Sequence, residues 1–275
     1  MRGFDSNFLV LHIFNSSTKV MEEKIMVRIN GICNSSGSQT ISVINGQVII
    51  NGNIVNNNSG NGLKEIDKTI SQDCSTINKI TIDSKFADVF VSASDSSKLV
   101  AHLYGKANVC SDFSFDLQVV ADELRLLFPS ESMCFIGELT LDIVLPKKLL
   151  NVLHISSTSN DITLFSGFSV DSLILETVSG DIDSRANFNQ LNASTVTGEV
   201  YVYAKPTHHN VNATIATVIG KVLVDFSNFG QLNLFIHSVN GSIEKPTADF
   251  GFRYVFSDSV ATVSISTVSG DITVF

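Results

Sequence analysis

The segment T-V-S-G-D-I at residues 177–182 decides the fold, because the same six letters return at residues 267–272 and related segments lie between them. Aligning these segments gives one turn residue in each of six units. The turn residues are Asn160, Gly180, Gly198, Gly220, Gly241 and Gly270. Their spacings are 20, 18, 22, 21 and 29 residues. A repeat of this length is typical of a solenoid, with one longer excursion before the last unit.

The positions around each turn residue keep their character from unit to unit. Seven and five residues before it stand apolar residues such as Leu173 and Leu175, and two residues after it stands Ile or Val, as at Ile182. Three residues before it stands Ser or Thr, as at Thr177. This period of two indicates β-strands with one face inward. We therefore predict an all-β, single-chain parallel β-solenoid whose coils each contain two short strands joined by a tight turn.

Stacking of such coils brings like residues together. The Ser and Thr positions are predicted to form an inward ladder of hydroxyl groups beside the turn. We expect Gly at the turn because it tolerates a positive φ angle, with Asn160 as the next most tolerant residue. Residues 80–91 fit the same columns with Ala87 at the turn, which predicts a first coil.

The remaining parts of the chain are less regular. Four alternating stretches are interpreted as longer strands of the same sheets, and they lie at residues 98–104, 113–120, 123–128 and 138–145. Asn-Gly pairs further upstream predict one or two small hairpins. The predicted organisation is an N-terminal extension at 1–26, a hairpin region at 27–55, a linker at 56–75 and the solenoid at 76–275.

The composition restricts the classes of partner. The chain has 275 residues and a formal net charge of −9, with 18 Lys and Arg residues. Nucleic acid is therefore a poor partner, since few cations are present to neutralise phosphates. No apolar run approaches the ~20 residues of a membrane span, so membrane insertion is not expected.

The four cysteines, Cys33, Cys74, Cys110 and Cys134, do not form the closely spaced pairs of a zinc site. A disulfide between Cys110 and Cys134 across adjacent strands is one interpretation, and four isolated small apolar side chains is the other. No metal or other cofactor is predicted.

The N-terminus leaves the compartment open. Residues 8–14 are apolar, but His12 interrupts them and no A-x-A-like cleavage site follows, so a signal peptide is only weakly indicated. A start of synthesis at Met21 or Met26 is the alternative interpretation.

Two kinds of chemistry are suggested by stacked residues and are not favoured. Asp161, Asp181 and Glu199 follow the turn residue and could offer oxygen ligands to Ca²⁺, but Lys221 and Ser242 interrupt the column. A polysaccharide hydrolase or lyase needs converging carboxylates or a cluster with Arg, and no such cluster emerges. We therefore predict that the chain is not an enzyme, with no catalytic, cofactor-binding or metal-binding residues.

One surface feature remains as a candidate interaction site. Two residues before the turn, the alternation places an outward side chain that is valine in five units. This stripe consists of Val178, Val196, Val218, Val239 and Val268. An exposed apolar row can mark a partner surface. The competing interpretation is that β-branched residues simply strengthen the outer face of a sheet, and it is preferred on the sequence alone.

The chain resembles the bacterial putative-adhesin domain family, a β-solenoid domain of unknown function. The resemblance rests on residues 141–146 (L-D-I-V-L-P), on residues 153–162, and on the two T-V-S-G-D-I units, and it covers roughly residues 76–275. It implies a structural or adhesive role in the cell envelope or outside the cell, and it carries over no catalytic residue. The lack of a clear signal peptide points instead to the cytoplasm.

The sequence thus predicts a non-enzymatic binding module whose partner is a protein or a glycan. A carbohydrate-active β-helix enzyme is one alternative. The other is an intracellular scaffold that associates end to end, because an open solenoid end exposes unpaired strand edges.

Overall fold

The computed structural model of the protein describes residues 41–44, 47–50, 53–55, 63–107, 115–127, 137–205, 210–245 and 256–275. The contacts between residues divide the chain into two units, Met1–Gly60 and Asn61–Phe275. Every regular element of the described residues is a β-strand. None of these residues forms a helix that is long and apolar enough to cross a membrane.

The first unit contains a small antiparallel sheet. Its three strands are β1 (Ile41–Ile44), β2 (Gln47–Ile50) and β3 (Asn53–Val55), paired in the order β1-β2-β3. The Asn-Gly pair at residues 30–31 lies outside the described residues, as do those at 45–46 and 51–52.

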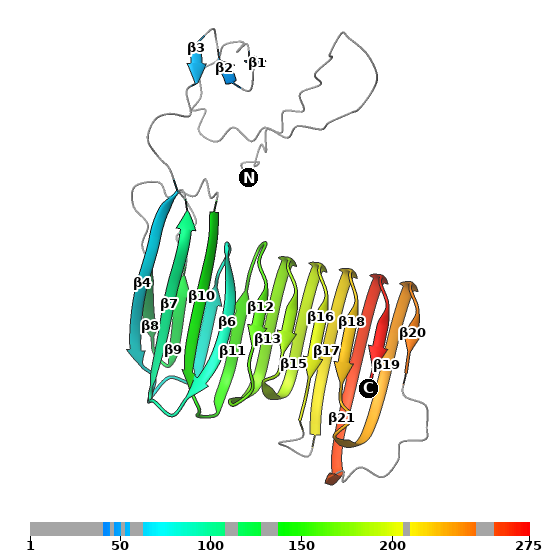
Figure 1. The fold of residues 1–275 in the computed structure, drawn as a ribbon. Helices are drawn as coiled ribbons and strands as arrows, with labels where there is room; N and C mark the ends of the chain where they lie inside the picture. Colours follow the sequence, from blue (N-terminus) through cyan, green and yellow to red (C-terminus); the bar gives the residue numbers. More distant parts are fainter. Residues whose placement is uncertain are drawn as a thin grey trace, which may run out of the picture. The chain divides into compact units, whose positions relative to one another are not determined.

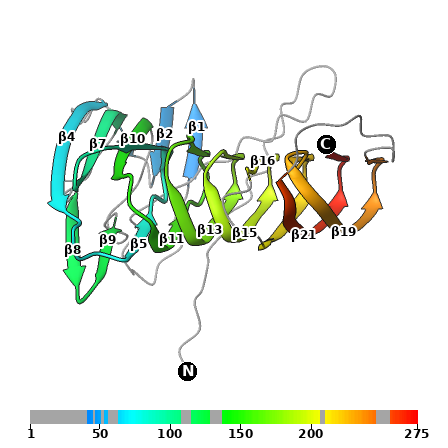
Figure 2. The ribbon, with the colours of Figure 1, turned by 90° about the horizontal axis from the view of Figure 1, so that it is seen from below.

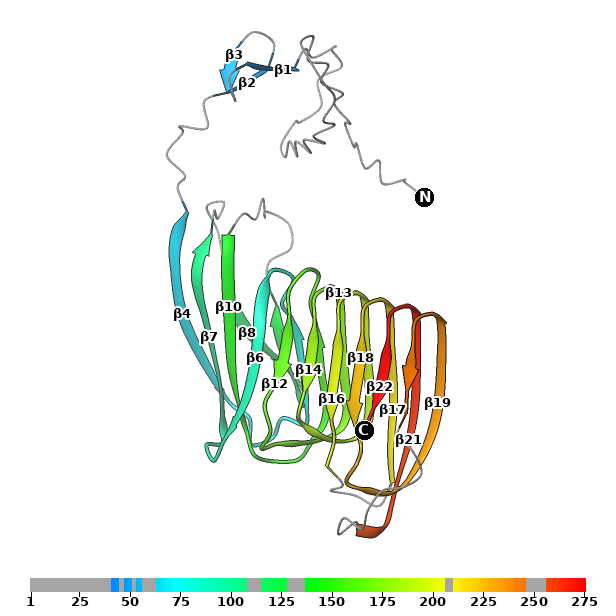
Figure 3. The same ribbon diagram turned by 45° about the vertical axis from the view of Figure 1, so that its right-hand side comes forward.

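The second unit consists of two long sheets (Figure 1, Figure 3). The ten-stranded sheet contains, in spatial order, β20 (Ile243–Glu244), β22 (Ile272–Val274), β18 (Val222–Asp225), β16 (Val200–Tyr203), β14 (Ile182–Ser184), β12 (Ile162–Leu164), β6 (Ala87–Ser94), β10 (Gly137–Pro146), β7 (Lys98–Ala107) and β4 (Lys64–Asp73). The nine-stranded sheet contains β19 (Phe229–Asn240), β21 (Phe256–Ser269), β17 (Asn210–Ile219), β15 (Asn187–Thr197), β13 (Ser169–Ser179), β11 (Leu150–Ser156), β5 (Lys79–Asp83), β9 (Glu123–Leu127) and β8 (Asp116–Val120).

The strand registers agree with the columns of the sequence. Leu173 of β13 is the partner of Leu191 in β15, and Thr177 is the partner of Thr195 in the same parallel pair. The first coil fits as well, because Ile80 pairs with Leu153. From β6 to β20 in one sheet and from β5 to β19 in the other, neighbouring strands are parallel. At the opposite end, β10 and β9 are also parallel to β6 and β5, whereas β7, β4 and β8 are added in antiparallel pairs.

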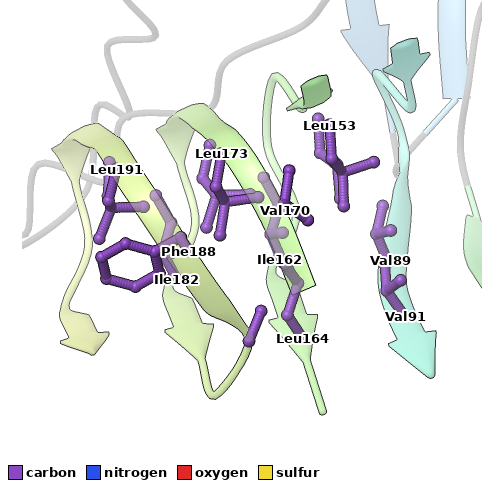
Figure 4. Packing of buried hydrophobic residues seen from close by; sticks show 14 of the residues in the cluster. Val89, Val91, Leu153, Ile162, Leu164, Val170, Leu173, Ile182, Phe188 and Leu191 are labelled. Atoms are coloured by element: carbon purple, nitrogen blue, oxygen red, sulfur yellow. The ribbon is translucent and has the colours of Figure 1, made fainter. Parts of the chain in front are cut away.

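The core lies between the two sheets. Alternate side chains of each strand point inward and are buried, as the burial pattern of β14 and β16 shows. Figure 4 shows Leu153, Leu173 and Leu191 at equivalent positions of successive coils, with Ile162 and Ile182 on the facing strands. One coil could not bury these side chains by itself, so the stack of coils is what stabilises the fold.

The last coil does not follow the chain order. Strand β21 lies between β17 and β19, and β22 lies between β18 and β20. The coil that contains Phe229–Glu244 is therefore the end of the solenoid, and the C-terminal coil is inserted between it and the coil of β17 and β18 (Figure 2). The 29-residue spacing before Gly270 supplies the chain for this crossing.

The structure corrects two expectations. The predicted linker at 56–75 is wrong in its second half, because Lys64–Asp73 form β4 at the edge of the ten-stranded sheet. An edge strand exposes most of its side chains, and its polar sequence therefore resembles a linker. The second expectation was that Ala87 lies at the turn of the first coil. Ala87 is instead buried as the first residue of β6, and the turn before it contains Lys85 with a positive φ of 35°.

The irregular stretches form strands as expected, namely β7, β8, β9 and β10. Cys74 is buried as a free thiol. Cys33, Cys110 and Cys134 lie outside the described residues, so the disulfide between Cys110 and Cys134 stays a prediction.

Candidate interaction face

The five predicted valines all lie on the outer surface of the nine-stranded sheet. Their exposed fractions run from 41% for Val218 to 61% for Val239. In spatial order the valine stripe is Val178, Val196, Val218, Val268 and Val239, on the adjacent strands β13, β15, β17, β21 and β19. The structure thus brings these residues together in one row.

The valine stripe borders a broad polar surface. Along the same five strands, the other outward positions are mostly amide and hydroxyl side chains. We call all outward positions of these five strands, including the valine stripe, the outer face. The polar residues include Ser172, Gln190, Asn192, Ser194, Asn212, Thr214, Asn233, Thr262, Ser264 and Ser266. Neighbouring strands stand ~4.8 Å apart, so these groups form rows with a short, regular repeat.

Formal charge is nearly absent from this surface. On the outward positions from residues 172, 190, 212, 262 and 233 up to the turns, Glu176 is the one carboxylate. Its Oε2 atom lies 3.2 Å from Nε2 of His154 on the neighbouring strand β11. The outer face therefore carries little charge, with Glu176 as its one carboxylate, although the chain has a net charge of −9.

A shallow depression lies in this face. Its volume is about 480 Å³, and its lining residues come from β13, β15 and β17. They are Ser172, Ile174, Gln190, Leu191, Asn192, Asn212 and Thr214. The lining supplies hydroxyl groups and amides, which can both donate and accept hydrogen bonds, and it contains no carboxylate.

The stacked carboxylates at the turns accept hydrogen bonds from backbone N–H groups. Oδ1 of Asp161 accepts the backbone N–H of Asp181 at 2.7 Å, and Oδ1 of Asp181 accepts that of Glu199 at 2.7 Å. At the solenoid end, Asp271 accepts the backbone N–H and the hydroxyl of Ser242, and these bonds lower the pKa of Asp271. Each carboxylate therefore links its own coil to the next. The described residues include no group of three His, Cys, Asp or Glu residues placed to hold a metal ion.

The hydroxyl ladder inside the turn has a defined acceptor. Oγ1 of Thr195 donates to the carbonyl oxygen of Gly180 at 3.1 Å, and Oγ1 of Thr217 donates to that of Gly198 at 3.2 Å. The buried Thr267 is an exception, because its hydroxyl has no hydrogen-bond partner among the described residues. The turn is thus held by side chains on both of its sides.

Sequence reasoning identified the valine stripe and missed the depression beside it. The alternation that exposes the valines also exposes the amides at Gln190, Asn192 and Asn212, so the signal was present in the same columns. These positions vary between Ser, Thr, Asn and Gln, and such variation is easily taken for ordinary polar surface.

The fold and the outer face define a class of protein: a β-solenoid domain whose outer sheet surface carries little charge. Residues 142–275 match the family model described as Toastrack DUF4097. The resemblance to the putative-adhesin domain family is confirmed in this part of the chain.

Solved structures of bacterial proteins are also similar to this chain. A putative cell adhesion protein from Clostridium sporogenes ATCC 15579 is 15% identical, with 77% of this chain and 99% of that chain covered and a TM-score of 0.47. A putative adhesin from Bacteroides fragilis NCTC 9343 is 12% identical, with 77% and 98% covered and a TM-score of 0.41. A putative lipid binding protein from Parabacteroides distasonis ATCC 8503 is 15% identical, with 76% and 96% covered and a TM-score of 0.32. Such distant similarity does not indicate what this chain binds.

Among curated proteins, none has a sequence that matches this chain.

Proposed function

We propose that the chain is a non-enzymatic binding module that holds a neutral glycan on its outer face. The observation that carries this proposal is the low charge of that surface, which holds mostly amide and hydroxyl groups and one carboxylate, Glu176, in a chain with a net charge of −9. When an uncharged, hydroxyl-rich polymer covers this surface, few charged groups have to lose their hydration.

The chemistry of the depression supports this choice of partner. Gln190, Asn192 and Asn212 each offer two N–H donors and one carbonyl acceptor, which suits sugar hydroxyls. The rows repeat from strand to strand, so a linear polymer can make the same contacts several times along the solenoid. The valine stripe would cover the apolar C–H surface of such a ligand at one margin.

The same lining favours binding over turnover. Hydrolysis of a glycosidic bond requires two carboxyl groups at a defined separation, and the depression contains none. A carbohydrate-active enzyme is the opposing hypothesis, and it predicts product formation from any glycan that binds.

A glycan array with the purified full-length chain tests the proposal, followed by a turnover assay on each retained glycan. The expected result is retention of neutral glycans with no release of new reducing ends. Retention of anionic glycans alone would contradict the assigned chemistry, and product formation would identify an enzyme. Failure of every glycan to bind, with capture of a purified protein ligand instead, would assign the outer face to a protein partner.

A further inference from the structure

The end of the solenoid that β19 and β20 form is an open edge in both sheets. Strand β19 is paired with β21 on one side, and β20 is paired with β22 on one side, and no described strand lies beyond them. Figure 1 shows this end coil opposite β4, which is the edge of the ten-stranded sheet at the other end of the stack. An open edge presents backbone N–H and C=O groups that can pair with another chain.

The end coil also leaves apolar side chains uncovered. Leu234 and Ile236 are only partly buried, whereas their register partners Val263 and Ile265 in β21 are buried in the core. In the facing sheet, Ile243 is 41% exposed while its partner Ile272 is fully buried. These side chains occupy core positions, and a further layer of protein would be required to bury them as completely as in the other coils.

The two ends of the solenoid differ in the charge of their edge strands. The edge strand β4 carries five charged residues, which are Lys64, Glu65, Asp67, Lys68 and Asp73. Charges of this kind protect an edge from pairing with other chains. The sequence of β19, F-G-Q-L-N-L-F-I-H-S-V-N, contains no Asp, Glu, Lys or Arg. Two copies of this chain repel each other through their net charge, and the end coil is a surface where they can meet without that repulsion.

We propose that two copies of the chain associate through their end coils, with β19 of one copy antiparallel to β19 of the other. A two-fold axis makes such pairing antiparallel and places the same uncovered residues on both sides. Leu234, Ile236 and Ile243 of each copy then become covered. A head-to-tail contact would instead place the charged strand β4 against Ile243, which is unfavourable because the charges would lose their hydration. A two-fold contact is closed, so assembly stops at a dimer.

Light scattering coupled to size-exclusion chromatography tests this proposal on the full-length chain, with a reductant present to exclude intermolecular disulfides. The chain mass is 29.8 kDa, and the expected result is a species of twice that mass at high concentration that dissociates on dilution. Hydrogen exchange on the same samples is expected to show slower exchange of the β19 amides in the dimer than in the diluted protein.

Two substitutions give a matched comparison. Ile236→Lys places a charge at an uncovered core position of β19 and is expected to abolish the dimer. Thr214→Lys places the same charge on an exposed outward position of β17, two strands from the end, and is expected to preserve it. Circular dichroism spectra test whether both variants are folded. If Ile236→Lys does not fold, Ile243→Ser replaces it, because Ile243 lies on the short terminal strand and is already exposed.

Three outcomes would overturn the proposal. A monomer at every concentration with fast-exchanging β19 amides would show that the edge is free. A monomer with slowly exchanging β19 amides would show that the chain covers its own edge. A ladder of higher oligomers would indicate head-to-tail stacking. None of these results would bear on glycan binding, which depends on the outer face and is measured separately.

Discussion

A Cβ atom at Gly198 would overlap the carbonyl oxygen of Gly180 in the preceding coil. The same relationship holds between Gly220 and Gly198, and between Gly270 and Gly220. Each turn therefore rests directly on the backbone of the turn before it. The close approach of successive turns, in addition to the φ angle, explains why the column is glycine.

Gly198→Ala is expected to destabilise the fold by about 2–4 kcal/mol, because it adds a steric overlap to an unfavourable backbone conformation. Gly167→Ala is the matched control. Gly167 also has a positive φ, of 118°, but a Cβ atom there would make only an ordinary contact with Ala93 at 3.5 Å. Urea denaturation measures both free energies of unfolding. Equal losses in the two variants would show that the contact between coils is not responsible.

The hydroxyl ladder gives a second prediction. Thr195→Val removes the hydrogen bond to the carbonyl oxygen of Gly180 and is expected to cost about 1 kcal/mol. Thr267→Val removes a buried hydroxyl that has no partner among the described residues, so it is expected to be neutral or stabilising. The thermal midpoints of the two variants, compared by calorimetry, measure this difference. Similar losses in both would mean that the ladder contributes no net hydrogen-bond energy.

The turn carboxylates give a third prediction. Asp181→Ala removes the acceptor of the Glu199 N–H and is expected to destabilise the fold by about 1 kcal/mol, and Asp181→Asn by less, because an amide oxygen still accepts. Asp183→Ala is the control, since Asp183 lies two residues away and pairs with Arg185 on the surface. Chemical denaturation of the three variants decides the matter. A loss for Asp183→Ala as large as that for Asp181→Ala would contradict the assigned role.

Acid should weaken the first coil through Glu123. Hydrogen bonds from Arg125 and Thr81 and the nearby Lys79 lower the pKa of Glu123 from 4.5 to about 2. The ionised carboxylate therefore stabilises the fold above pH 4.5, and this contribution is lost as the pH falls from 4.5 toward 2.

Glu123→Gln is accordingly expected to be less stable than the wild type at neutral pH, and the difference should shrink as the pH falls through that window. Urea unfolding at a series of pH values measures the difference. A gap between the two proteins that stays constant down to pH 2 would show that Glu123 does not titrate in the predicted way.

The repeating half of the fold could be predicted from the sequence because its strands have an inner and an outer face. The columns through Leu173, Thr177 and Ile182 specify both the alternation and the register, since a slip of one residue would turn every apolar side chain outward. The polar strand β4 lacks this signal, because an edge strand contacts the sheet on one side only.

The order of the last two coils could not be predicted from those columns. Val263 and Ile265 of β21 fit equally well beside Ala213 and Ile215 of β17 or at the end of the stack. The partly exposed core positions of β19 follow from this order, so the open end was not visible in the sequence either. Of the proposed binding surface, the sequence predicted only the apolar margin, the valine stripe.

The most direct test of the account is a titration of one neutral glycan from the array against three forms of the chain. The first is the wild type, and the second combines Gln190→Ala, Asn192→Ala and Asn212→Ala, which removes the amides from the depression. The third combines Arg185→Ala, Tyr203→Ala and Lys205→Ala, which alters exposed residues on or next to the ten-stranded sheet. The account predicts that the second form loses binding by at least tenfold and that the third binds like the wild type. Unchanged affinity in the second form, or a loss confined to the third, would contradict it.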